Sequence, residues 1–196
     1  MPLSTDTTWP ACLLKIFEIC RNKLQPLESR YYGPYTKLLT YCFGPDSFDF
    51  FVAPQSLPSE VSLHDAIDFV VFLIVFDADC RPMFIAEIKD DAWATKADLR
   101  LKADNQIRQR YDSMLPDCPI PRFWGLSLLG TSLRVYCGDI ATNNVTPAFE
   151  DRPSPGRVLP RNFLEGAWNI DILSQEGFDK MKEIVEDIVG SAAMLQ

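Results

Sequence analysis

Residues 66–91 read AIDFVVFLIVFDADCRPMFIAEIKDD and contain two apolar runs separated by a short polar link. The first run, residues 66–76, is β-branched and aromatic and is apolar on both faces after Asp68, which is typical of a covered central strand. The second run, residues 81–89, follows so closely that the pair predicts a β-hairpin. It ends with Glu87 and Lys89, and a buried charge without a partner is costly. The sequence therefore indicates that these two side chains meet charged partners.

Strand geometry predicts one such partner. Side chains alternate between the faces of a strand, so Glu87 and Lys89 lie on the same face. If the hairpin turn holds two or four residues, Asp68 lies directly opposite Lys89 and diagonal to Glu87, at Cβ distances of roughly 5 and 7 Å. A turn of odd length would reverse this face. With an even turn, two carboxylates lie beside one ammonium group, and this is the arrangement that we expect.

The rest of the chain predicts a layered fold around this hairpin. An aromatic run before Pro54 predicts a strand over 48–55, and two more strands are expected over 122–138 around a turn at Gly130 and Thr131. The proline-rich segment 147–160 predicts irregular structure. Apolar residues at helical spacing predict four helices, over 7–24, 28–44 (kinked or restarted near Gly33 and Pro34), 93–114 and 174–190. We expect a single α/β or α+β domain over residues 1–196, with its core at about 28–140.

Composition excludes several classes of protein. The formal charge of -8 argues against a surface coated with basic residues, although it allows a local basic groove. The six cysteines form no CxxC pair and His64 is the only histidine, which disfavours a zinc site. No secretory signal or membrane-length apolar stretch is visible. These features predict an intracellular protein with free thiols, in the nucleus or cytoplasm, without a membrane partner.

The expected charges suit metal-assisted phosphodiester hydrolysis. Asp68 and Glu87 can share one hard cation, because Mg²⁺ and Mn²⁺ prefer oxygen ligands. The backbone carbonyl of Ile88 offers a further ligand. Lys89 can orient the attacking water or stabilise charge that develops on the phosphorus centre.

The same residues resemble a known superfamily. Asp68 in one strand and EIK at the end of the next are similar to the PD-(D/E)XK nucleases. The wider run YYGPYTKLLTYCFG, FVAPQ, IDFVVFLIVF, MFIAEIK, ADNQIRQRY and WGLSLLGTSLRVY is similar to PD-(D/E)XK-like proteins of fungi, over about residues 28–190. The resemblance implies a restriction-endonuclease-like αβββαβ core, with a mixed central sheet flanked by helices, an extra strand and a C-terminal helix.

The resemblance also implies roles for particular residues. Asp68 and Glu87 would be the metal ligands, Lys89 the catalytic lysine and Glu28 the additional acid of the early helix. Gln106 lies where some members carry a glutamine. The chain departs from the pattern in two places: Ile67 replaces the usual proline, and Tyr111 is one residue too far from Gln106 for the QxxxY motif.

Each candidate also has a structural interpretation. Glu87, Lys89 and Asp68 can form an ion pair at a hairpin end, where exposed pairs contribute little. The spacing of Arg100, Asp104 and Arg108 predicts a solvated, ion-paired helix face, and Arg100 is the best candidate among the basic residues of this helix for a phosphate contact. The other candidates with two interpretations are Gln55 (substrate contact or strand-capping amide), Asp90 and Asp91 (second metal or helix start), His64 (catalysis or solvated loop) and Tyr31, Tyr32 and Tyr35 (base stacking or packing).

The sequence thus favours a Mg²⁺- or Mn²⁺-dependent nuclease, an endonuclease acting on DNA rather than RNA. The rival hypothesis is a nuclease-like fold without catalysis that serves as a protein-interaction or nucleic-acid-binding module. Either hypothesis is compatible with a homodimer.

Overall fold

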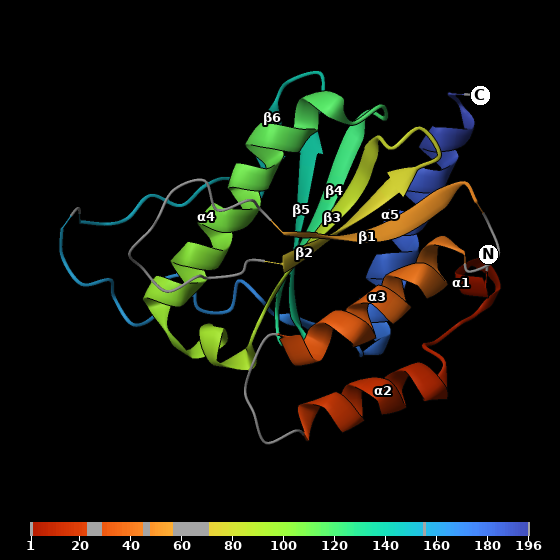
Figure 1. Cartoon of the computed structure of the whole chain (residues 1–196). Helices are drawn as coiled ribbons and strands as arrows, with labels where there is room; N and C mark the ends of the chain where they lie inside the picture. The colour runs from red at the N-terminus through yellow and green to blue at the C-terminus, as the bar shows by residue number, and fades with distance from the viewer. Residues whose placement is uncertain (1, 23–28, 45–47, 57–70, 155, 196) are drawn as a thin grey trace.

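The computed structural model describes residues 2–22, 29–44, 48–56, 71–154 and 156–195; for Pro2, Gln55, Ser56 and Val71 it describes the backbone alone. The elements follow one another along the chain as labelled in Figure 1. The α-helices are α1 (Pro2–Thr5), α2 (Ala11–Arg21), α3 (Ser29–Phe43), α4 (Ala97–Met114) and α5 (Gln175–Ala193). The 3-10 helices are η1 (Asp91–Thr95) and η2 (Leu115–Asp117). The strands are β1 (Phe50–Ser56), β2 (Val71–Asp77), β3 (Pro82–Lys89), β4 (Arg122–Leu129), β5 (Ser132–Asp139), β6 (Asn144–Thr146) and β7 (Ile170–Asp171).

The strands form one mixed sheet in the order β1-β2-β3-β4-β5-β6, and β7 also pairs with β5. Strands β3 and β4 are parallel, while the other pairs are antiparallel. A parallel connection needs a crossover, and α4 supplies it. The predicted α/β architecture with a mixed sheet and a C-terminal helix is confirmed. The short strands β6 and β7 were not predicted.

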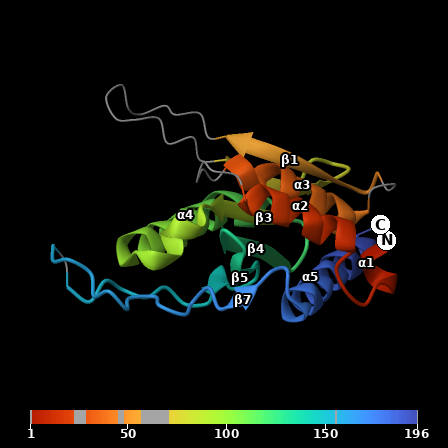
Figure 2. The ribbon, with the colours of Figure 1, turned by 90° about the horizontal axis from the view of Figure 1, so that it is seen from below.

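Helices cover both faces of the sheet. Figure 2 shows α4 on one side and α1, α2, α3 and α5 on the other. The second side holds the larger apolar core, where Phe43 of α3 packs on Phe84 of β3 with ring centroids 5.8 Å apart. Helix α3 runs without interruption through Pro34, so the predicted restart there is wrong. Pro34 lies in the second turn, where its ring interrupts only one early hydrogen bond of the helix.

The β2–β3 hairpin differs from the predicted register. Asp77 and Arg81 close the turn through the Asp77 N–H and the Arg81 carbonyl, 3.1 Å apart, which leaves an odd number of residues between them. Cys80 in this turn has a φ of 60°, as is usual in a hairpin with a bulge. A register shift between Val75 and Phe76 then compensates for the odd turn, so that Phe72 lies opposite Glu87. The expected pairing, with Val70 opposite Glu87, is therefore wrong by two residues.

The register shift does not change which side chains of β2 lie on the same face of the sheet as Glu87. Even-numbered residues of β2 still share a face with Glu87, because the bulge reverses the alternation a second time. Asp68 lies outside the described residues, so its expected position opposite Lys89 is not tested.

The helix predicted over 93–114 is divided in the structure into η1 and α4, because Lys96 between them is extended. Several other local predictions agree with the structure. Strands β4 and β5 meet at the expected Gly130–Thr131 turn. Pro54 lies inside β1, at the edge of the sheet, where its missing N–H is tolerated. The described part of 147–160 contains no helix or strand, and none of the six cysteines is in a disulfide. None of the helices among the described residues has the length and apolar character required to cross a bilayer.

Candidate functional site

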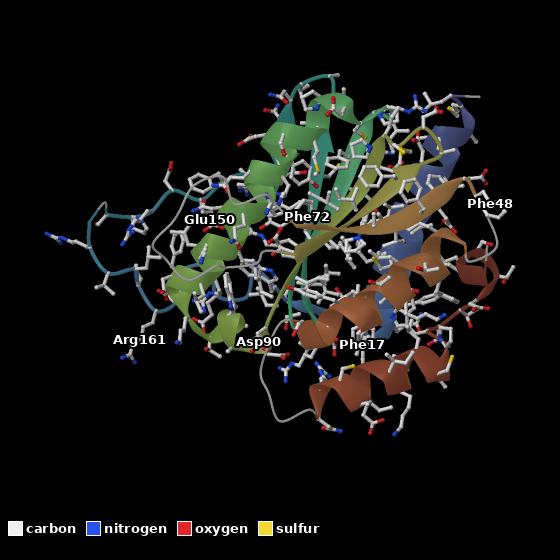
Figure 3. All side chains as sticks on the ribbon, viewed as in Figure 1. Phe17, Phe48, Phe72, Asp90, Glu150 and Arg161 are labelled. Carbon is white, nitrogen blue, oxygen red and sulfur yellow. The ribbon has the colours of Figure 1, made fainter. Side chains whose placement is uncertain are left out.

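A row of mostly polar side chains crosses the sheet beneath α4. Phe72 of β2 lies opposite Glu87 of β3, Glu87 opposite Ser127 of β4, and Ser127 opposite Arg134 of β5. These four residues therefore share the face that α4 covers, and Figure 3 shows Phe72 between the sheet and α4. Because this row lies beneath a helix, its charged side chains need partners of opposite charge.

Glu87 and Lys89 are brought together as the sequence predicts, and Arg110 of α4 joins them. Lys89 Nζ lies 3.2 Å from Glu87 Oε1, and Arg110 Nε lies 3.4 Å from Glu87 Oε2. Glu87 is 1 % exposed, Lys89 2 % and Arg110 5 %. Neither Glu87 oxygen accepts a hydrogen bond among the described residues. Charge attraction without hydrogen bonds thus holds the carboxylate, which keeps lone pairs for another partner.

Aromatic rings border this cluster on two sides. The Arg110 guanidinium lies 4.3 Å from the centre of the Phe72 ring. Lys89 Nζ lies 5.1 Å from the Trp93 ring, and Lys102 Nζ lies 5.5 Å from the same ring. Each distance is within the range of a cation–π contact. Trp93 therefore connects the buried lysine to an exposed lysine on α4.

A second charged cluster lies on the same face. Asp104 of α4 is 1 % exposed and accepts a hydrogen bond of 2.6 Å from the Tyr136 hydroxyl. It also pairs with Arg108 Nε at 2.9 Å and with Arg134 Nη1 at 3.2 Å. Burial, together with the charge of Asp104, raises the pKa of the Tyr136 hydroxyl far above its usual range. Tyr136 therefore stays protonated and donates to the carboxylate at any physiological pH.

Arg134 extends this second cluster to the loop before β7. Its guanidinium lies 5.3 Å from the Trp168 ring, and Trp168 Nε1 donates a 3.1 Å hydrogen bond to Ser127 Oγ. The sequence does not predict this network, because its members come from α4, β4, β5 and a distant loop. The sequence holds one signal for such a network, which is the presence of Arg134 and Tyr136 in a largely apolar strand.

Two predictions about the charged residues of α4 are wrong. The line formed by Arg100, Asp104 and Arg108 is not a solvated face, because Arg100 is 5 % exposed and Asp104 1 %. Arg100 donates to the carbonyls of Ala94, Arg161 and Phe163 at 2.7 to 3.0 Å. Its guanidinium therefore fixes the 161–163 loop against α4 and is not available for the expected phosphate contact.

Asp90 and Asp91 connect η1 to α3. Asp90 caps η1 by accepting from the Ala92 N–H at 3.0 Å, as the helix-start interpretation predicts. Arg30 of α3 pairs with Asp90 at 2.9 Å and with Asp91 at 2.6 Å. Tyr31 donates to Asp91 at 2.5 Å, and burial with this hydrogen bond raises the pKa of Tyr31 to about 12. Tyr31 is thus engaged in packing rather than exposed for base stacking.

The same region makes Gly130 sensitive to substitution. Gly130 has a φ of 63°, and a Cβ there would lie 1.8 Å from Asp91 Oδ1. The Gly130 carbonyl also accepts a 2.7 Å hydrogen bond from Tyr35. We expect Gly130→Ala to lower the free energy of unfolding by about 2 kcal/mol or more, because backbone strain and a displaced Asp91 act together. Urea unfolding tests this, with Gly33→Ala, where nothing lies within 4 Å of the added Cβ, as the control; equal stabilities would contradict the expectation.

The remaining predicted site residues are only partly described. Asp68, Glu28 and His64 lie outside the described residues, as does the side chain of Gln55. Ile88 pairs with Leu128 in the sheet, and its role as a carbonyl ligand stays a prediction. Gln106 lies one helical turn from both Lys102 and Arg110, and its buried Oε1 has no hydrogen-bond partner among the described residues.

The donor set fits a divalent cation in part. The Glu87 carboxylate is a ligand of the kind that a hard cation prefers, but Lys89 and Arg110 already lie 3.2 and 3.4 Å from its two oxygens. Within the described ranges, however, no group of three or more His, Cys, Asp or Glu side chains is arranged around one point. A cation at Glu87 would therefore need oxygen ligands from backbone, water, substrate or the residues that are not described.

Comparison with known proteins adds no family assignment. No family model matches the chain, and no curated protein or solved structure gives a significant match.

Proposed function

We propose that this protein is a metal-dependent nuclease of the PD-(D/E)XK type that hydrolyses phosphodiester bonds, in DNA rather than RNA, with Mg²⁺ or Mn²⁺. The observation that carries the proposal is the contact between Glu87 and Lys89 at the end of β3, beneath helix α4. A carboxylate can hold the cation for such hydrolysis, and an ammonium group beside it can orient the attacking water.

The order of elements supports the same proposal. Helix α3, the antiparallel strands β1, β2 and β3, the crossover α4 and the parallel strand β4 follow one another in the sequence αβββαβ. This is the order of the restriction-endonuclease-like core that the sequence resembles. In that arrangement the active carboxylate and lysine lie on the third strand, where Glu87 and Lys89 are.

The proposed roles follow from the positions of the side chains. Glu87 would hold the cation, with Asp68 and the Ile88 carbonyl as the further oxygen ligands, and Glu28 would be the additional acid. The bound cation supplies an activated water and neutralises charge on the phosphate. Lys89, 3.2 Å from Glu87, would orient that water through its ammonium hydrogens. Gln106 would be the catalytic glutamine that some members carry on the helix after the lysine strand, and Gln55 would contact the substrate.

Burial of the pair favours a second candidate. Glu87 and Lys89 are almost fully buried, and Arg110 already occupies one side of the carboxylate. A nuclease-like fold that has lost catalysis and serves as a protein-interaction or nucleic-acid-binding module would keep such a closed ionic cluster. For cutting, Arg110 or Trp93 has to move so that a phosphate can reach Lys89.

Two measurements on the wild-type protein separate these candidates. We expect purified protein to cut supercoiled plasmid or single-stranded DNA when Mg²⁺ or Mn²⁺ is added, and EDTA to stop the cutting. Isothermal titration with Mg²⁺ alone should give heat of binding. Absence of both cutting and metal binding would leave only the non-catalytic module.

A further inference from the structure

A groove lies between α4 and the loop that passes beside it. It has a volume of about 1010 Å³. Its α4 wall includes Lys102, Gln106 and Gln109, and its loop wall includes Arg152, Val158 and Arg161. Figure 3 shows Arg161 on this loop, beside the end of α4 at which the helix begins. Arg100 holds that loop in place, because its guanidinium donates a hydrogen bond of 2.7 Å to the Arg161 carbonyl. The loop wall of the groove is therefore fixed.

The groove is basic in an acidic protein. Lys96, Lys102, Arg152 and Arg161 line it, and Asp98 is the one acidic residue among its described lining. All four cations are exposed. Lys96 and Arg161 take part in no ion pair within the described part of the chain. Because the whole chain carries a formal charge of -8, this local positive excess is an electrostatic site for a polyanion.

The groove adjoins residues that cover the candidate catalytic cluster. Lys102, which lines the groove, lies over the Trp93 ring, and that ring also contacts Lys89. Gln106, also in the lining, is one turn from Arg110, which pairs with Glu87. A chain lying in the groove would therefore pass beside the residues that cover Glu87.

We propose that this groove binds single-stranded nucleic acid, with Lys96, Lys102, Arg152 and Arg161 along the phosphates. The amides of Asn105, Gln106 and Gln109 in the lining suit the exposed base edges of an unpaired strand. A duplex hides the Watson–Crick edges of its bases in pairing, so these amides could not reach them. The inference deepens the proposed nuclease function, since it names the substrate form, but binding itself requires no catalysis.

The test is fluorescence anisotropy with a labelled oligo-dT of about 15 nucleotides, in EDTA, so that metal and cutting do not contribute. We expect binding at low salt, with a slope of log affinity against log salt of about -2 to -3 for three or four phosphate contacts. The Lys96→Glu, Arg161→Glu double variant should lose about tenfold or more in affinity and have a shallower slope. A duplex of the same length should bind more weakly.

The matched control is Lys15→Glu, Lys37→Glu, which changes the net charge equally at exposed positions of α2 and α3 on the other side of the sheet. It should bind like the wild type. No binding by the wild type, equal losses in the two double variants, or equal affinity for duplex would each overturn the inference.

The test separates this inference from the proposed function. If the wild type binds through the groove but never cuts, the groove stands and the nuclease proposal fails. If the wild type cuts and the groove variant binds normally, the nuclease proposal stands and the inference about the groove fails.

Discussion

Replacing Glu87 with glutamine is expected to reduce metal-dependent cutting by more than about a hundredfold, because loss of an outer-shell partner of a metal alone costs 10–100-fold. The amide keeps the size of the side chain but removes the charge that attracts the cation. It also removes the partner of Lys89 and Arg110, which lie 3.2 and 3.4 Å from the carboxylate. Initial rates on supercoiled plasmid, with Mg²⁺ and with Mn²⁺, measure the effect.

The control for this variant is Glu186→Gln, because Glu186 is an exposed carboxylate of α5, on the other side of the sheet from α4. It should cut at the wild-type rate. Circular dichroism and thermal unfolding of Glu87→Gln show whether the fold is kept. Lys89→Met removes the amine without touching the carboxylate and should also abolish cutting while Mg²⁺ binding persists. Folded Glu87→Gln protein that cuts at the wild-type rate would contradict the assignment of the site.

Replacing Asp104 with asparagine is expected to have the largest effect on stability. Asp104 is buried and compensates Arg108 and Arg134, and it accepts the hydrogen bond of Tyr136. Removing one partner of a buried ion pair costs about 3 to 5 kcal/mol, because the remaining charge is left without compensation. For a chain of this length the midpoint of thermal unfolding should fall by roughly 6 to 20 °C.

The matched control is Asp112→Asn, which removes the same charge from an exposed position of the same helix. Its unfolding midpoint should change little, because exposed charges contribute little to stability. Calorimetry or chemical denaturation compares the three proteins. A midpoint for Asp104→Asn within about 2 °C of the control would show that the buried network is not a major source of stability.

Much of the fold could be predicted because its signals are local. Helices α2, α4 and α5, strands β3, β4 and β5 and the turn at Gly130 follow from apolar spacing and turn residues that lie close together in the sequence. The proximity of Glu87 and Lys89 also follows locally, since residues two apart in a strand share a face. The residue opposite Glu87 could not be obtained in this way, because an odd turn and a bulge both shift the register.

Local patterns in the sequence specify the order of the long helices and of strands β1 to β5, and they place an acid and an amine at the end of a covered strand. They do not specify that Arg110 closes over that acid, that Asp104 is buried with Arg134, or that Arg100 holds a loop. The physical reason is that helical spacing specifies which residues of α4 share a face, but not how the helix is turned against the sheet. That orientation depends on side chains from β2, β4, β5 and the 161–168 loop, which are distant in the sequence and meet only when the chain is folded.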